Sequence, residues 1–127
     1  MTIYDLPNDK RLEATRRIRM IIGTKDSWIR EDMSLTEKIR TRESYDRLFE
    51  KLGKIYATHG DKALAMNFTD HGTYKEGVTP GGKKWYLDMN SGWTTRSRHC
   101  GTLRIEGEGV IFTSGTLAKA FEYILNH

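Results

Sequence analysis

The two halves of the chain differ in composition, and this difference constrains the fold more than any other feature. Residues 1–60 contain 13 Lys and Arg, 10 Asp and Glu, and only three Gly. Residues 61–127 contain nine of the 12 Gly and two of the three Trp, and apolar and polar residues alternate in short stretches. The first pattern is typical of helices and the second of β-hairpins. The sequence therefore predicts an α+β fold, with two N-terminal helices, an antiparallel meander of about four or five short strands, and a C-terminal helix packed on one sheet face.

The length and composition indicate one ordinary domain. With 127 residues the chain is long enough to bury one core, and no linker or low-complexity tract interrupts it. We therefore expect a single α+β domain over residues 1–127. The net charge of +4 and the pI of about 9.2 are a mild basic bias, which is compatible with a polyanionic partner but does not require one.

The expected compartment is the cytoplasm. Cys100 is the only cysteine, so an intramolecular disulfide is excluded and a reducing setting is favoured. The first residues lack the basic and apolar regions of a secretory signal. No apolar run approaches the roughly 20 residues that span a bilayer, so we expect no membrane partner.

Helices are predicted in the first half from their end signals. The first begins near Pro7, whose fixed φ suits a first helical turn, and ends before Gly23, which suits the C-terminal cap. The second follows a capping box formed by Ser34 and Glu37. Trp28, between the two helices, is expected in a further helical turn that packs on the core.

Turn residues divide the second half into short strands. The turn signals lie at 79–82, 90–92 and 107–109. The predicted strands cover 83–89, 93–99, 102–106 and 110–113. Alternation over 64–68 indicates a further strand, with a short helix as the alternative. The final helix is expected to begin near Thr113 and Ser114.

The alternating residues also predict which side chains share a face. A hairpin with a three-residue loop at 90–92 places Tyr86 opposite Arg96 and Lys84 opposite Arg98. Strand side chains alternate between faces, so these four lie together while their apolar neighbours point to the core. A one-residue slip would bury the arginines, so the apolar pattern supports this register.

The predicted face has a functional interpretation. The next hairpin places Arg98 opposite Arg104, and like charges that oppose each other across strands destabilise a sheet by about 0.2–1 kcal/mol. Guanidinium groups bind phosphates, and Tyr86 is suited to stack on an unpaired base. The alternative is a solvated sheet face with ordinary basic side chains. The predicted contact residues are Lys83, Lys84, Tyr86, Arg96, Arg98 and Arg104.

No residues form a recognisable catalytic, metal or cofactor pattern. Neighbours on a strand point to opposite faces, so His99 and Cys100 are not expected to form a nucleophile–base pair. His71 follows Asp70, but no regular spacing brings further metal ligands to them. The Gly-rich stretches lack the spacing of a phosphate-binding loop. We therefore expect no catalytic residues, no metal and no cofactor.

The sequence leaves three classes of function open. The preferred class is a non-enzymatic module that binds single-stranded or structured nucleic acid through the basic, aromatic sheet face. The second is a protein-interaction module, an inhibitor or adaptor of a larger protein with an acidic surface, because Arg and Tyr are favoured interface anchors. The third is a small hydrolase or nuclease that uses Asp70 and His71, or the carboxylates Asp88 and Glu106. No pattern of a known family is evident.

Overall fold

The computed structural model describes residues 1–71, 74–88 and 100–127, and the chain divides into two compact units, Met1–Gly60 and Asp61–His127. The first unit is helical, and the second holds a five-stranded antiparallel sheet followed by a helix. The predicted α+β fold is therefore confirmed. The single domain over 1–127 stays a prediction, and each unit is described by itself.

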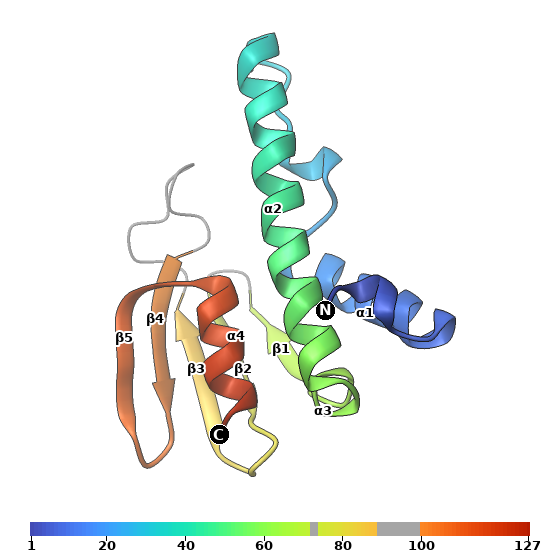
Figure 1. Ribbon diagram of the computed structural model, residues 1–127. Coiled ribbons are helices and arrows are strands. Elements are labelled where there is room, and N and C mark those ends of the chain that lie inside the picture. Colours follow the sequence, from blue (N-terminus) through green and yellow to red (C-terminus); the bar gives the residue numbers. More distant parts are fainter. Residues whose placement is uncertain (72–73, 89–99) are drawn as a thin grey trace. The chain divides into compact units, whose positions relative to one another are not determined.

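Two long helices form the first unit. They are α1 (Asn8–Ile22) and α2 (Leu35–His59), with the short 3-10 turns η1 (Ile3–Asp5) and η2 (Asp26–Trp28) before and between them. Figure 1 shows α1 crossing α2. Gly23 ends α1 with a φ of +81°, a conformation that favours glycine. The core side chains of this unit include Ala14, Ile18, Ile21, Trp28, Tyr45, Leu48, Leu52 and Tyr56.

The start of α2 and the turn before it follow the sequence signals. The Ser34 hydroxyl accepts a hydrogen bond from the Glu37 N–H at 3.2 Å and donates one to the Glu37 carboxylate at 3.2 Å. Trp28 is buried, and its ring packs edge-on against Tyr45 at a centroid distance of 5.1 Å. The Trp28 indole N–H donates to the Ile22 carbonyl at 2.7 Å, so η2 is fixed to the end of α1.

The second unit is a meander whose strands lie in chain order, β1-β2-β3-β4-β5 (Figure 1). Its elements are α3 (Asp61–Leu64), β1 (Phe68–Asp70), β2 (Tyr74–Val78), β3 (Lys84–Asp88), β4 (Cys100–Ile105), β5 (Gly109–Thr116) and α4 (Leu117–Leu125). The alternation over 64–68 thus corresponds to the end of one helical turn and the start of a strand.

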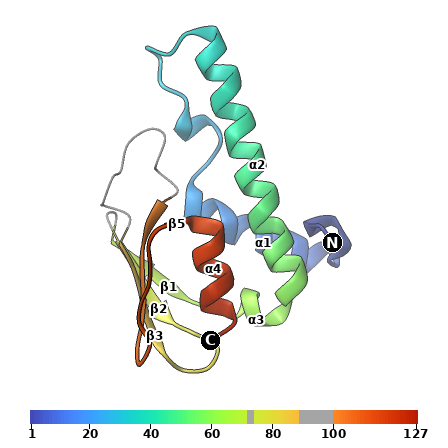
Figure 2. The ribbon, with the colours of Figure 1, turned by 60° about the vertical axis from the view of Figure 1, so that its left-hand side comes forward.

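One face of this sheet carries the core. Figure 2 shows α4 on one side of the sheet. The ring of Phe121 on α4 lies 6.0 Å from both Phe68 on β1 and Trp85 on β3. Leu87 and Leu103 on the same face have no exposed surface. The C-terminal helix therefore covers one sheet face, as predicted.

The predicted partner of the strand at 84–88 is wrong. Tyr86 on β3 pairs with Glu76 on β2 and with Arg104 on β4. A strand has two edges, and β2 and β4 occupy both edges of β3. Residues 93–99 lie outside the described residues. The prediction failed because it omitted β2 and joined β3 to the next stretch of alternating residues by the shortest loop.

The last helix begins later than predicted. β5 continues to Thr116, which pairs with Cys100 on β4. The Thr116 hydroxyl then accepts a hydrogen bond from the Lys119 N–H at 3.3 Å and caps α4. Thr113 stays in the strand, where its carbonyl accepts from the Thr102 hydroxyl at 3.1 Å. Pairing with β4 therefore outweighs the capping tendency of Thr113 and Ser114.

Candidate binding face of the sheet

The sheet face opposite α4, which we call the open face, carries the candidate site. Side chains alternate along each strand, so the residues that do not join the core lie here. Most of them are half-buried or exposed polar and aromatic residues. The open face is formed by Thr69, Tyr74, Glu76, Val78, Lys84, Tyr86, Asp88, Thr102 and Arg104.

Three stacked rings form an aromatic column across this face: His71, Tyr74 and Tyr86. The rings of His71 and Tyr74 lie 4.4 Å apart with an interplanar angle of 18°. Those of Tyr74 and Tyr86 lie 4.8 Å apart at 23°. His71 follows β1, and its N–H donates to the Tyr74 carbonyl at 2.9 Å, which fixes its place beside β2. Because β2 lies between β1 and β3, the Tyr74 ring is covered on both sides by its neighbours.

Arg104 extends the column to β4, because it is the cross-strand partner of Tyr86. Directly opposed residues have Cβ atoms about 4.5–5.5 Å apart, so the side chains of Arg104 and Tyr86 start next to each other on the open face. Partial burial raises the pKa of the Tyr86 hydroxyl, and the Asp88 carboxylate acts in the same direction. Arg104 lowers that pKa. The net effect is a pKa above the ordinary value, which favours the neutral hydroxyl.

A carboxylate orients the first ring of the column. Nε2 of His71 lies 3.2 Å from Oε1 of Glu76, the next open-face residue after Tyr74 on β2. The pair is partly exposed, with 35% of the His71 side chain accessible. Asp70, which precedes His71 in the sequence and was considered as its partner, pairs instead with Lys75 at 3.5 Å. Glu76 was missed because its strand was not predicted.

The described residues of the open face carry mixed charge, and the expected basic surface, which includes Arg96 and Arg98, stays a prediction. Lys84 and Arg104 are the predicted cations that lie on it, and both are exposed. Glu76 and Asp88 are close to the column, and Glu106 follows β4 with its N–H donating to the Lys84 carbonyl at 2.8 Å. On the described open face, the two carboxylates Glu76 and Asp88 therefore balance the two cations Lys84 and Arg104.

The two other predicted arginines, Arg96 and Arg98, lie outside the described residues. The expected pairing of Arg98 with Arg104 is wrong, because Arg104 pairs with Tyr86 on one side and Val110 on the other. Arg104 therefore has no arginine as a cross-strand partner, and the charge repulsion that motivated the binding hypothesis loses its basis. The aromatic column replaces it as the unusual feature of this face.

Lys83, the remaining predicted contact residue, is engaged elsewhere. It precedes β3, and its ammonium group lies 3.0 Å from Glu108 in the turn between β4 and β5. Nε2 of His127 also lies 2.7 Å from Glu108. The hydrogen bond from Lys83 lowers the pKa of Glu108, with His127 adding to this effect. Lys83 thus connects two turns of the sheet.

A shallow hollow of about 300 Å³ adjoins the aromatic column. Glu76 and Lys84 place opposite charges around it, and Thr69 adds a hydroxyl group. The residues that line it are Thr69, Glu76, Gly77, Val78, Lys84 and Trp85. The hollow therefore offers both a hydrogen-bond donor and acceptors next to stacked rings.

The geometry gives little support to a hydrolytic carboxylate pair. Asp88 is opposite Thr102 at one end of β3, and Glu106 lies beside Lys84 at the other end. Four residues of strand separate them by about 13 Å, too far to act on one bond. Within residues 1–71, 74–88 and 100–127, no three His, Cys, Asp or Glu side chains come together as metal ligands.

The column was missed although a sequence signal for it exists. The residue types at 70–72, Asp, His and Gly, favour a turn, and Tyr74 and Val78, both of types common in strands, precede the next turn at Pro80. These two signals together indicate a hairpin with Tyr74 and Glu76 on one face.

Comparison of the chain with known protein families, with curated proteins and with solved structures finds no match. In the parts of the chain that the structure describes, no helix combines the length and the apolar character needed to cross a membrane. Function has to be argued from the open face itself.

Proposed function

We propose that the chain is a non-enzymatic binding module that takes up single-stranded nucleic acid on the open face. The observation that carries this proposal is the aromatic column with Arg104 beside Tyr86. Aromatic rings and guanidinium planes are the groups on which unpaired bases stack, at about 1–3 kcal/mol per base. The faces of His71 and Tyr86 that point away from Tyr74 are the positions offered to bases.

The mixed charge of the open face favours unpaired bases over a duplex. A duplex presents a dense row of phosphates, which Glu76 and Asp88 would repel. A single strand can turn its bases toward the sheet, where their amino groups donate to carboxylates and their phosphates reach Lys84 and Arg104. Arg96 and Arg98 remain predicted phosphate contacts. The single cysteine supports a cytoplasmic setting for this activity.

A salt series tests the proposal. Fluorescence anisotropy with labelled 12-nucleotide DNA and RNA should show binding whose log K falls with log salt, with a slope of about −3 if four cations contact phosphates. Replacing Lys84 and Arg104 together by Ala should flatten the slope by about 1.4. Lys119→Ala, which removes an exposed cation from α4, is the matched control and should leave the slope unchanged.

Tyr86→Ala separates stacking from charge. It should weaken binding of single strands about tenfold or more and leave the salt slope unchanged, because it removes a ring without removing a cation. If the wild-type protein binds neither single strands nor duplex at low salt, the nucleic-acid proposal is wrong.

The second candidate is a protein-interaction module, an inhibitor or adaptor. The mixed charges around the column favour it, because interfaces combine Tyr and Arg anchors with a polar rim of both signs. Failure of nucleic-acid binding, together with co-purification of a partner that Tyr86→Ala and Arg104→Ala abolish, would support this function.

A further inference from the structure

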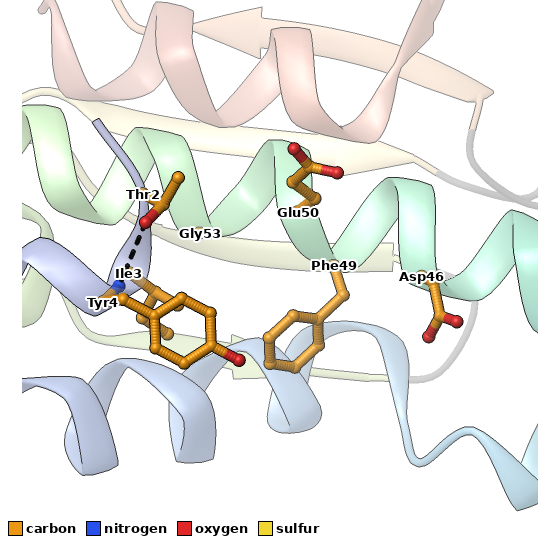
Figure 3. Close-up of a pocket in the computed structure, with 7 residues that line it drawn as sticks. All are labelled: Thr2, Ile3, Tyr4, Asp46, Phe49, Glu50 and Gly53. Carbon is orange, nitrogen blue, oxygen red and sulfur yellow. Dashed lines mark hydrogen bonds between the residues drawn. The ribbon is translucent and has the colours of Figure 1, made fainter.

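A separate pocket lies in the first unit, between η1 and the middle of α2 (Figure 3). It has a volume of about 280 Å³ and is lined only by residues of Met1–Gly60. The lining residues are Thr2, Ile3, Tyr4, Asp46, Phe49, Glu50 and Gly53. They comprise two aromatic rings and two carboxylates but no basic side chain.

Hydrogen bonds at the start of η1 hold Tyr4 in place. The Thr2 hydroxyl accepts from the Tyr4 N–H at 3.3 Å, the contact drawn in Figure 3, and the Thr2 N–H donates to the Asp5 carboxylate at 2.7 Å. Gly53 lines the pocket without adding a side chain to it. The backbone at the pocket entrance is therefore fixed by local hydrogen bonds.

The aromatic side of the pocket is accessible to a cation. Figure 3 shows the rings of Tyr4 and Phe49 next to each other. The Tyr4 side chain is 77% exposed, and the guanidinium carbon of Arg11 lies 5.9 Å from its ring centroid. That distance is within the range of a cation–π interaction, so the chain itself already places a cation on this ring.

The lysines that pair with the two carboxylates of the pocket can be exchanged for another cation. Asp46 pairs with Lys25 at 2.8 Å and Glu50 pairs with Lys54 at 3.4 Å. In both pairs more than 40% of each side chain is exposed. Such surface ion pairs contribute about 0–1 kcal/mol each, so a bound cation can replace the lysines at little cost.

We propose that this pocket binds a weakly hydrated organic cation, a quaternary ammonium or guanidinium group. Ring faces attract such cations, and nearby carboxylates add to the attraction. A primary ammonium group is more strongly hydrated and loses more on leaving water. The proposal concerns the first unit and is independent of nucleic-acid binding by the open face.

The test is an NMR titration of the full chain with choline, following the backbone amides of Tyr4, Phe49 and Gly53. Half-saturation is expected on the order of 1 mM, the affinity of one small cation. The neutral isostere 3,3-dimethylbutanol should bind at least about tenfold more weakly. Equal binding of the two compounds would overturn the proposal.

Substitutions test whether the NMR shifts caused by choline arise from binding in this pocket. The double variant Asp46→Asn with Glu50→Gln should weaken choline binding about tenfold, whereas Glu43→Gln, an exposed residue of α2 outside the lining, should not. Tyr4→Ala removes an exposed ring without disturbing the core and should also weaken binding. Unchanged affinity in both pocket variants would contradict the site.

A second titration identifies the source of the cation. If N-acetyl-arginine amide binds more tightly than choline, the natural ligand is a basic side chain of another protein. If choline binds more tightly, it is a small quaternary ammonium compound. N-acetyl-lysine amide should be the weakest of the three, and a stronger affinity for it than for both others would refute the preference for weakly hydrated cations.

Discussion

Tyr74 and Tyr86 come from adjacent strands and stack with their ring centroids 4.8 Å apart. His71 stacks on the other side of Tyr74, so this ring is the centre of the aromatic column. Removing it should separate the outer two rings and affect both the stability of the sheet and the binding surface.

We predict that Tyr74→Ala lowers the free energy of unfolding by about 1–2 kcal/mol, because an aromatic pair contributes about 0.5–1.5 kcal/mol beyond its buried area and this ring makes two such pairs. Tyr74→Phe keeps the ring and should cost less than about 0.5 kcal/mol. Urea titration followed by circular dichroism measures both. Equal losses in the two variants would show that stacking contributes nothing.

Two glycines should respond in opposite ways to alanine. A Cβ at Gly77 would lie 2.8 Å from the Asn67 carbonyl and 3.0 Å from the Trp85 ring, so Gly77→Ala should destabilise the sheet by about 1–3 kcal/mol. At Gly53 the nearest atom is Ile3 Cβ at 3.5 Å, an ordinary contact. Gly53→Ala should therefore stabilise α2 by about 0.5–1 kcal/mol. Thermal unfolding of both variants checks the signs, and a loss in Gly53→Ala would contradict the prediction.

Phe121 should be the most costly side chain to remove from α4. Its ring packs against both Phe68 and Trp85, and the residue is 2% exposed, so Phe121→Ala should cost about 3–5 kcal/mol. Glu122→Ala, next to it on the exposed side, should stay within about 0.5 kcal/mol of the wild type. Chemical denaturation distinguishes the two, and similar stabilities would mean that α4 does not cover the sheet in solution.

Alkaline conditions should destabilise the first unit through Tyr56. Burial raises the pKa of its hydroxyl from 10.0 to about 12, so the folded state favours the neutral form. This contribution is complete below pH 10 and is lost as the pH rises toward 12, on the order of 2 kcal/mol in total. Tyr56→Phe should show a smaller loss over the same range in unfolding experiments at several pH values. Identical pH dependence in the two proteins would rule out this role of Tyr56.

Acid should weaken the first unit through Glu13. Hydrogen bonds from Arg16, at 2.6 and 3.0 Å, lower the pKa of Glu13 from 4.5 to about 2, and Arg17 acts in the same direction. The stabilisation is present above pH 4.5 and is lost as the pH falls toward 2. An NMR titration of the Glu13 carboxyl carbon should give a midpoint well below 4.5, and Arg16→Met should move it upward. A wild-type midpoint near 4.5 would contradict the ion pair.

The helices could be predicted because their signals are local. Gly23 and Ser34 act on the backbone within one turn, so no distant residue alters their effect. The faces of the strands were also predictable. Tyr86 pairs with Arg104 instead of Arg96, a shift of eight positions, and because this shift is even, Tyr86 and Arg104 still share the face predicted for them.

The pairing of the strands and the aromatic column, unlike the helix ends and the strand faces, could not be predicted from the sequence. The choice of partner for β3 depends on loop lengths, which the alternation of side chains does not encode. His71 joins the column from a connecting segment, where no periodicity applies. The prediction that Lys84, Tyr86 and Arg104 share a face was correct. Tyr74 and Glu76, which add a ring and a carboxylate to that face, were missed because they lie on β2, a strand that was not predicted.

The meander has a consequence for synthesis on the ribosome. Each strand after β1 pairs with the strand made just before it, so the sheet can grow hairpin by hairpin as the chain emerges. Its apolar face, with Trp85 and Leu103, receives α4 only after β5 is complete. A nascent chain that stalls before Leu117 would leave this apolar sheet face exposed to water. At that stage the chain would be prone to aggregate and would be a substrate for chaperones.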